Sequence, residues 1–399
     1  MVSSQPYYRG VYAYPWDIVQ EGVLPFRNLI SAQGLSAVSL AISYHMGKFL
    51  SPRRKQGRVY FPEDGAVYFN PTVSRYGKIK PYAHPDKELR QVATEIAEMT
   101  DLEVHAWAVL FHNTRLGTNY PDAVVRNAWG DSYIYSLCPV NPQVGEYGVA
   151  LIKDVALTLP VKSVVVETPG FLPYPHGYHH EFAQVESQPW LEMLLGLCFC
   201  NHCLQQSHDE TGIDSSGVRA RVATMLDGFL ESPCEVPSDM AYAWITADLL
   251  QDAELLTFLR WRMQRVSALV RQLRAVLPKS VALAIIPTVQ RPTAATWLEG
   301  SNLKELAESA DFLEIPFYEP AASRAIADAW DSVRRVSGDT AKIRAIIRPG
   351  PPDLDAGRET TAAVKGLADL GIRNFAFYNW GLLRKSDFIR IGEALNAVS

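Results

Sequence analysis

Four of the five cysteines are spaced as ligands of a single metal ion. Cys198, Cys200 and Cys203 supply three thiols within a short segment, and Cys138, which is followed by proline, is the natural fourth ligand. Thiolates at this spacing converge on one tetrahedral ion, and a set of four leaves no open coordination position. His202 could replace Cys138, although ligands so close together would strain the geometry. We therefore predict a structural zinc ion (Zn2+); the alternative is that these are free cysteines buried in the core.

Glu167 is the leading candidate for a catalytic acid. It ends the largely apolar segment Ser163–Glu167 and is followed by Thr168, Pro169 and Gly170. Burying an unpaired carboxylate is costly, so a charge at the end of a buried strand normally has a partner or a function. A structural acid held in a salt bridge is the alternative to catalysis.

Hydrolysis of a glycosidic bond requires a second carboxyl group, which attacks the anomeric carbon or activates water. Glu314, within the apolar segment 312–317, is the preferred candidate. Glu319 lies just beyond that segment but could instead cap the following helix. Asp353 and Asp17 are further candidates. A separation of about 5 Å between the two carboxyl groups would give retention of configuration, and roughly 6.5 to 9.5 Å would give inversion.

Aromatic and polar residues gather at predicted strand ends, where they could hold a sugar. Sugar rings have apolar CH faces and a rim of hydroxyl groups, so their sites combine aromatic platforms with amide, acid and imidazole partners. The candidate substrate-binding residues are Tyr14, Trp16, Asp17, His45, His112, Asn113, His179, Arg348, Tyr378, Asn379 and Trp380, with Tyr44 and Trp107 beside them. For any one of them the alternative is a place in the core or at a loop cap. Their concentration at one end of the strands favours a small carbohydrate substrate.

The histidine-rich segment 176–181 could bind a catalytic metal. Together with His45 or His112 it would then form the site of a metal-dependent sugar isomerase or lyase. However, it lacks the HExxH spacing of a helical zinc site, and Pro173, Pro175 and Gly177 predict an irregular loop. We favour a lid whose histidine or tyrosine side chains contact substrate hydroxyls.

Eight short β-rich segments, each followed by a helical pattern, predict the scaffold that positions these residues. The segments are 11–14, 37–43, 102–111, 163–167, 281–287, 312–317, 342–348 and 374–379. This alternation predicts a (β/α)8 barrel, or TIM barrel, in the α/β class. A doubly wound sheet would instead have a Gly-rich phosphate loop after its first strand, where this chain has Tyr14, Pro15, Trp16 and Asp17.

Two long insertions are predicted in the loops after strands two and four. Residues 46–84 have the pattern of a hairpin with Asp64-Gly65 at its turn, and residues 168–240 carry most of the cysteine cluster. One long helix is predicted over residues 242–276. A minimal barrel takes about 250 residues, so residues 1–399 fit a single barrel domain with extended loops. Both insertions fall at the C-terminal ends of strands, where barrel enzymes have their active sites.

Residues 129–205 resemble the glycoside hydrolase family 42 β-galactosidases, which are (β/α)8 barrels. The resemblance rests on a CPxxP motif at 138–142 and a CxCxxC motif at 198–203. It implies a four-cysteine zinc cluster and an acid/base glutamate at the end of strand four, the position of Glu167. The chain departs from the family in having Val166 before that glutamate in place of asparagine, and in lacking a nucleophilic glutamate at the end of strand seven. The resemblance therefore implies a distant glycosidase with its own substrate.

Composition limits the partners of the protein. Lys plus Arg is 38 against 43 for Asp plus Glu, a net charge of -5, which lacks the basic excess needed to bind nucleic acid. No apolar run approaches the roughly 20 residues that cross a bilayer, and the first residues lack the pattern of a secretory signal. We expect a cytoplasmic protein without a membrane or nucleic-acid partner, which could form a homo-oligomer.

The leading hypothesis is a glycosidase that hydrolyses a small glycoside or oligosaccharide with Glu167 and Glu314. The metal-dependent isomerase or lyase is the first alternative. A catalytically inactive carbohydrate-binding barrel is the second, and the missing glutamate on strand seven favours it.

Overall fold

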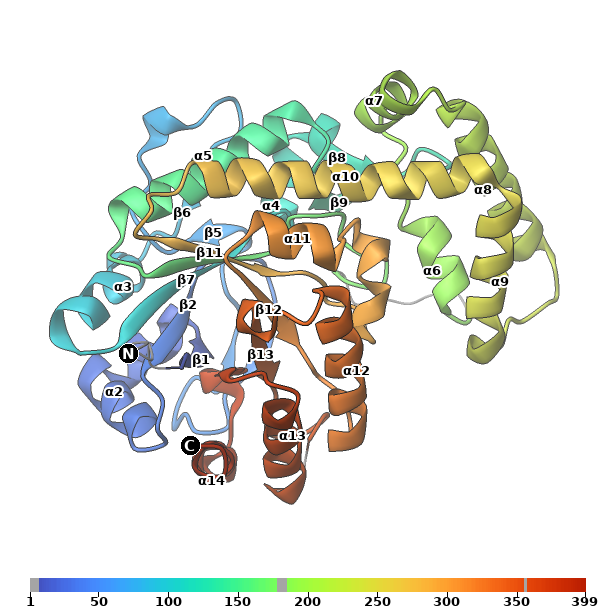
Figure 1. The fold of residues 1–399 in the computed structure, drawn as a ribbon. Coiled ribbons are helices and arrows are strands. Elements are labelled where there is room, and N and C mark those ends of the chain that lie inside the picture. The colour runs from blue at the N-terminus through green and yellow to red at the C-terminus, as the bar shows by residue number, and fades with distance from the viewer. Residues whose placement is uncertain (1–6, 178–184, 355–356) are drawn as a thin grey trace.

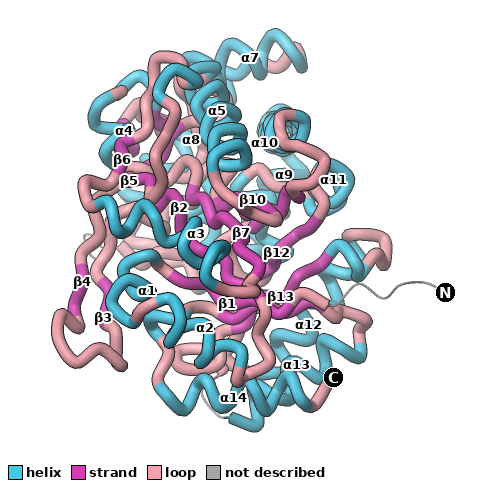
Figure 2. The backbone as a smooth tube through the Cα atoms, turned by 90° about the vertical axis from the view of Figure 1, so that its left-hand side faces the viewer, coloured by secondary structure: helices cyan, strands magenta, loops and turns pink. Residues whose placement is uncertain are grey.

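Across residues 7–177, 185–354 and 357–399, which the computed structural model describes, eight parallel strands close into a barrel (Figures 1 and 2). The predicted TIM-barrel fold is thus confirmed. The barrel strands are β1 (Arg9–Ala13), β2 (Ala37–Tyr44), β7 (Glu103–Val109), β10 (Ser163–Glu167), β11 (Ala282–Ile286), β12 (Phe312–Pro316), β13 (Ile343–Ile347) and β14 (Asn374–Phe377). The barrel closes because Val11 of β1 pairs with both Phe377 of β14 and Val38 of β2.

Alternation along each strand separates the helix-facing core from the barrel interior. In β10, Val164 and Val166 belong to the main hydrophobic core, whereas Val165 belongs to the cluster inside the barrel. Because side chains alternate with a period of two, Ser163 and Glu167 share the inward face with Val165. The last residue of β10 is therefore directed to the mouth of the barrel.

Helices surround the barrel and cover the outward faces of its strands (Figure 2). Those that follow the strands are α1 (Pro15–Glu21), α2 (Val23–Ser31), α3 (Lys87–Met99), α5 (Pro142–Thr158), α10 (Ala253–Ala275), α11 (Leu303–Ser309), α12 (Ala322–Arg335), α13 (Gly357–Asp369) and α14 (Lys385–Asn396). Helix α3 shows the pattern, because it buries Leu89, Val92 and Ile96 at helical spacing. None of the helices within the described residues is both long and apolar enough to cross a membrane.

The insertion after β2 differs from the predicted hairpin. Strand β3 (Phe49–Leu50) pairs with β4 (Val59–Tyr60), whereas β5 (Ala66–Val67) pairs with β2 and with β6 (Tyr82–Ala83). The Asp64-Gly65 turn does form, with Gly65 at a φ of 62°, but it directs the chain to the edge of β2 instead of folding β5 back on β4. The pairing with β2 adds β5 to the main sheet.

The helices of the loop after β10 form an extension at one side of the barrel, and the loop after β7 lies between that extension and the barrel (Figure 1). After β7 come α4 (Thr114–Asn119) and the hairpin β8 (Val124–Arg126) and β9 (Ser132–Leu137). After β10 come α6 (Pro189–Leu195), α7 (Asn201–Thr211), α8 (Ser215–Glu231) and α9 (Ser238–Gln251). These helices enclose a second hydrophobic core, which includes Trp190, Val222 and Ile245.

The single helix predicted over residues 242–276 is two helices, α9 and α10. The break falls at Asp252, whose side chain accepts a hydrogen bond from the Leu255 backbone N–H and so caps the start of α10. Helix α10 belongs to both cores: Phe258 packs in the extension, and Val270 and Leu273 pack against the barrel.

Candidate active site

A cavity of about 330 Å³ lies at the C-terminal end of the barrel strands. Its walls come from all eight barrel strands or the loops that directly follow them, together with residues of the insertion after β2. The lining residues are Tyr12, Tyr44, His45, Phe49, Trp107, Glu167, His176, Ile286, Val289, Arg291, Pro316, Tyr318, Ile346, Arg348 and Tyr378. The predicted location of the pocket is therefore occupied by a real cavity of the size that holds a small ligand.

Glu167 is the single carboxylate among the described lining residues of this cavity. Trp107, on the neighbouring strand β7, donates a hydrogen bond from Nε1 to Glu167 Oε2 at 2.7 Å. Burial raises the pKa of Glu167 to about 7, and the indole N–H opposes that shift by favouring the carboxylate. A carboxyl group that titrates near neutrality can donate or accept a proton during turnover.

Glu314 lies deeper in the barrel than the cavity. Its side chain is fully buried, and its Oε1 forms an ion pair with Arg344 Nη1 at 2.9 Å. The hydroxyl of Tyr12 donates a hydrogen bond to the other carboxylate oxygen. Glu314 does not line the cavity because it is the third residue of β12, below Pro316, which does line it. Among the described residues that line the cavity, Tyr12 is hydrogen-bonded to Glu314.

Tyrosine hydroxyls join the aromatic walls into one network. Tyr14 bonds through its hydroxyl to those of Tyr44 at 3.0 Å and Tyr378 at 2.9 Å. Tyr44 and Tyr378 line the cavity, whereas Tyr14 is buried behind them and stacks on Trp16 at 4.4 Å between ring centroids. Tyr14 and Trp16 thus support the wall but do not form its surface, in contrast to the binding role predicted for them.

Two arginines, Arg291 and Arg348, give the cavity a positively charged wall. Arg291 follows β11 and Arg348 follows β13, and both guanidinium groups pair with Asp353, at 3.1 Å and 2.8 Å. Both also lie over the ring of Tyr318, at 4.9 Å and 4.3 Å from its centroid. Asp353, a predicted alternative to Glu314, is therefore ion-paired with both arginines and does not line the cavity.

Another buried glutamate, Glu299, shapes the loop after β11. It accepts hydrogen bonds from Thr288 Oγ1 at 2.5 Å and from the Val289 backbone N–H at 2.8 Å. Burial, with a smaller contribution from the charge of Glu167, raises the pKa of Glu299 to about 8. Since Val289 lines the cavity, Glu299 holds one of its edges. Glu299 could not be predicted from sequence, because it ends the short 3-10 helix Thr293–Glu299, far from any predicted strand end.

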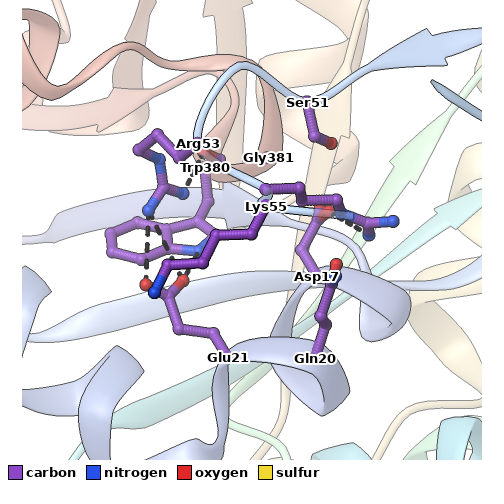
Figure 3. A pocket seen from close by; sticks show the side chains of 9 residues that line it. Asp17, Gln20, Glu21, Ser51, Arg53, Lys55, Trp380 and Gly381 are labelled. Atoms are coloured by element: carbon purple, nitrogen blue, oxygen red, sulfur yellow. Dashed lines mark hydrogen bonds and ion pairs between the residues drawn. The ribbon is translucent and has the colours of Figure 1, made fainter. Parts of the chain in front are cut away.

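Asp17 and Trp380 line a different pocket, of about 250 Å³ (Figure 3). Asp17 forms an ion pair with Arg54 at 2.7 Å, and burial raises its pKa to about 6. The Trp380 indole donates to Glu21 at 2.8 Å, and the Arg53 guanidinium lies 4.2 Å from its ring centroid. Neither residue reaches the barrel-mouth cavity, because each lies in the first turn of a helix that starts directly after its strand.

The remaining predicted residues divide between structural positions and the cavity. Asn113 caps α4 by accepting from Leu116 N, and Asn379 likewise accepts from Gly381 N. Glu319 pairs with Arg324 at 2.8 Å outside the cavity. The cavity contains Tyr44, His45, Trp107, Glu167, Arg348 and Tyr378 of the predicted set, and it adds Tyr12, Phe49, Arg291 and Tyr318. Tyr12 could have been found from alternation with Tyr14 along the first strand.

Three histidines lie together at one edge of the cavity. The rings of His45 and His112 stack with centroids 4.0 Å apart, and His176 approaches His112 at 5.3 Å. Burial lowers the pKa of His45 to about 4, so it is a neutral ring at pH 7. In the part of the chain that the structure describes, the four cysteines are the only group of potential metal ligands. His179 and most of the predicted metal-binding segment lie outside the described residues.

The four predicted cysteines converge at the junction between the barrel and the extension. Cys138 follows β9, Cys198 and Cys200 precede α7, and Cys203 lies in its first turn. All four are buried, and their sulfur atoms lie within 4.8 Å of one another. The Cys138 sulfur is 3.8, 3.7 and 3.5 Å from those of Cys198, Cys200 and Cys203. Tetrahedral Zn–S bonds of about 2.3 Å require sulfur separations of about 3.8 Å, so the set fits zinc.

Known glycoside hydrolases share this fold. The glycoside hydrolase domain of PgaB (BpsB) from Bordetella bronchiseptica is 15% identical, with a TM-score of 0.57, over 98% of this chain and 99% of that one. The catalytic domain of β-amylase from Paenibacillus polymyxa is 11% identical, with a TM-score of 0.57, over 98% of both chains. α-L-Fucosidase isoenzyme 2 from Paenibacillus thiaminolyticus is 11% identical, with a TM-score of 0.53, over 98% of this chain and 49% of that one.

These similarities define the fold class, a barrel of the type found in glycoside hydrolases. No protein-family model matches the chain, and no curated protein sequence matches it. The resemblance to family 42 is therefore not confirmed and stays a prediction.

Proposed function

We propose that the protein is a glycoside hydrolase in which Glu167 is the general acid. The observation that carries this proposal is a carboxyl group with a pKa of about 7 in an aromatic-lined cavity at the mouth of the barrel. Such a group is partly protonated at neutral pH, which suits protonation of a leaving-group oxygen. The aromatic rings of Tyr44, Trp107 and Tyr378 offer apolar platforms for the faces of a sugar.

The hydrogen bond from Trp107 favours one carboxyl oxygen as the site of the proton. An indole N–H can only donate, and a carbonyl oxygen accepts better than a hydroxyl oxygen, so the bond to Glu167 Oε2 favours the acidic proton on Oε1. Oε1 would protonate the glycosidic oxygen as the bond to the anomeric carbon breaks. The resulting carboxylate would then be stabilised by Trp107 and could accept a proton from water in a later step.

Glu314 would serve as a positioning residue instead of the second catalytic carboxyl group. Its ion pair with Arg344 and its hydrogen bond from Tyr12 fix the tyrosine that forms the floor of the cavity. Among the described residues no other carboxylate lines the cavity. Attack on the anomeric carbon would thus fall to water or to a group of the substrate itself, as in substrate-assisted glycosidases.

A panel of aryl α- and β-glycosides tests the proposal. At least one member should release its aryl group, and Glu167→Gln should lower kcat/KM for it by about 10² to 10⁴-fold. Glu98→Gln, on the exposed face of α3, is the matched control and should leave kcat/KM within about twofold. Unchanged hydrolysis by Glu167→Gln would refute the assignment. Sugar binding without cleavage of any glycoside would instead identify an inactive carbohydrate-binding barrel.

We also propose that Cys138, Cys198, Cys200 and Cys203 hold a structural zinc ion. The four sulfur atoms leave no coordination position for substrate, so the ion would join the loop after β7 to the insertion after β10 and take no part in bond cleavage. Metal analysis of the purified protein should give one zinc ion per chain. A metal content of zero with four reduced thiols would refute this proposal.

A further inference from the structure

The cavity carries more positive charge than its own carboxylates balance. Arg291 and Arg348 both line it, and the two guanidinium groups share one carboxylate, that of Asp353. Within the described residues, no second acidic side chain pairs with either arginine. Glu167, with a pKa of about 7, supplies only part of a negative charge at neutral pH. The two guanidinium groups therefore keep a net positive charge that a ligand can neutralise.

The arrangement directs this charge toward the cavity. The Asp353 side chain is 4% exposed, whereas those of Arg291 and Arg348 are 36% and 24% exposed. The shared carboxylate thus lies behind the arginines, and the guanidinium groups reach the open space. Tyr318 supports both of them through cation–π contacts. Each guanidinium group uses one nitrogen to bind Asp353. Because a guanidinium has five N–H donors, the remaining donors can bind a ligand.

A guanidinium group held in this way recognises a particular chemistry. Arginine binds carboxylate, sulfate and phosphate groups through paired, charge-assisted hydrogen bonds, and fixing the side chain in advance lowers the entropy cost. The pKa of Glu167 is governed by burial and by Trp107, and neither arginine is among its causes. The anion-binding wall and the proposed general acid are thus separate elements of one cavity.

We propose that the substrate is an anionic glycoside, whose acidic group binds between Arg291 and Arg348 while Glu167 acts on the glycosidic bond. This inference rests on the proposed glycosidase function and defines its substrate class. The acidic group could be the carboxylate of a hexuronic acid or a sulfate or phosphate ester on a hexose, because each offers arginine two negatively charged oxygens for paired hydrogen bonds.

The experiment compares aryl glycosides of one anomeric configuration that differ only at C6. The set contains the neutral hexoside, the hexuronide, the 6-sulfate and the 6-phosphate, and kcat/KM is measured for each with the complete protein. At least one anionic member should exceed the neutral one by at least tenfold. The preferred member identifies the source of the charge. Raising the salt concentration should reduce the ratio, since the partly exposed charges are screened.

Variants connect the preference to the two arginines. Arg291→Gln and Arg348→Gln should each lower the ratio of anionic to neutral kcat/KM by about 10 to 100-fold, because each removes a charge-assisted contact. Arg348→Lys keeps a cation beside Asp353 but loses the planar fork, so it should retain a fraction of the preference even if the glutamine variants fold poorly. Arg324→Gln, which breaks an ion pair outside the cavity, is the matched control and should leave the ratio unchanged.

The possible results separate this inference from the proposed function. Cleavage of the neutral hexoside at a rate equal to or above every anionic one would overturn the inference and leave the glycosidase proposal intact. Calorimetric binding of free hexuronates or of hexose sulfates or phosphates, without cleavage of any glycoside, would support the anionic ligand and overturn the hydrolase. A preference that persists in both glutamine variants would show that other residues recognise the anion, and would overturn the assignment to these arginines.

Discussion

Burial and the indole N–H act on Glu167 in opposite directions, and burial has the larger effect. The pKa of the carboxyl group is raised from 4.5 to about 7, so the folded protein holds this proton over a range in which the unfolded chain has lost it. Such a group costs stability whenever the pH exceeds its unfolded pKa, because folding then places an anion in a poor environment. The cost grows from pH 4.5 and is complete above pH 7.

Glu167→Gln should therefore stabilise the protein at alkaline pH. At pH 8 the free energy of unfolding should rise by about 1 to 3 kcal/mol, whereas at pH 4 it should match that of the unchanged protein. Denaturant unfolding at the two pH values measures the difference. A gain of the same size at both values would show that the effect is packing and not the carboxylate charge.

The ion pair below the cavity should show the opposite behaviour. Glu314→Gln leaves Arg344 charged and unpaired in the barrel interior, which should cost about 3 to 5 kcal/mol of unfolding free energy. Replacing both partners, as Glu314→Gln with Arg344→Met, should recover a large part of this loss because no buried charge remains. If the double variant were as unstable as the single one, the pair would not be the source of the cost.

The two glutamates show how far sequence can locate catalytic groups. The sequence pattern placed Glu167 at the end of an apolar strand and Glu314 within another, and both lie on those strands in the structure. How far each side chain lies below the mouth of the barrel was not predictable. Glu167 is the last residue of β10, whereas two residues of β12 follow Glu314. The distance of a residue from the barrel mouth depends on the register between neighbouring strands. Here Glu314 of β12 pairs with Arg344 of β13, and the sequence of one strand does not encode that register.

Among the secondary-structure elements, the position at which a helix begins after its strand determines whether a predicted residue reaches the cavity. The strands and most helices followed from periodicity, but the sequence did not indicate how abruptly the chain turns after β1 and β14. Helix α1 starts at Pro15, directly after Tyr14, so Asp17 is carried into another pocket. Residues at strand ends were predicted to hold a sugar, and Asp17 and Trp380 do not reach the cavity because a helix begins within one or two residues of each.

A substitution at Asn113 can show whether this residue binds substrate or caps helix α4. It was predicted to contact substrate, but its side chain accepts from Leu116 N at the start of α4. Asn113→Ala should lower the unfolding free energy by about 1 kcal/mol and leave KM for any accepted glycoside unchanged. Asn113→Asp, which retains the cap, should restore stability. A large rise in KM with normal stability would instead support contact with the substrate.

At the scale of the whole molecule, the helix-facing core of the barrel and the core of the extension meet along α10. The barrel core was predictable because it repeats one pattern, whereas the extension follows no repeat and its sequence signal was the cysteine motif alone. The four sulfur atoms lie where the loop after β7 meets α7, within the second core. Helix α9, in contrast, lies at the outer part of the extension and has many exposed residues.

Removal of the proposed zinc should therefore loosen the extension before the barrel. Four thiols without a metal lose the cross-link between two loops, while the main core keeps its strands and most of its helices. A strong chelator, or Cys198→Ser, should increase amide hydrogen exchange in α6–α9 and leave exchange in β1, β2 and β14 unchanged at moderate temperature. Cys234→Ser is the matched control, because Cys234 is exposed and outside the cluster. If both cores lost protection together, α10 would couple them into one cooperative unit, and a structural role confined to the extension would be refuted.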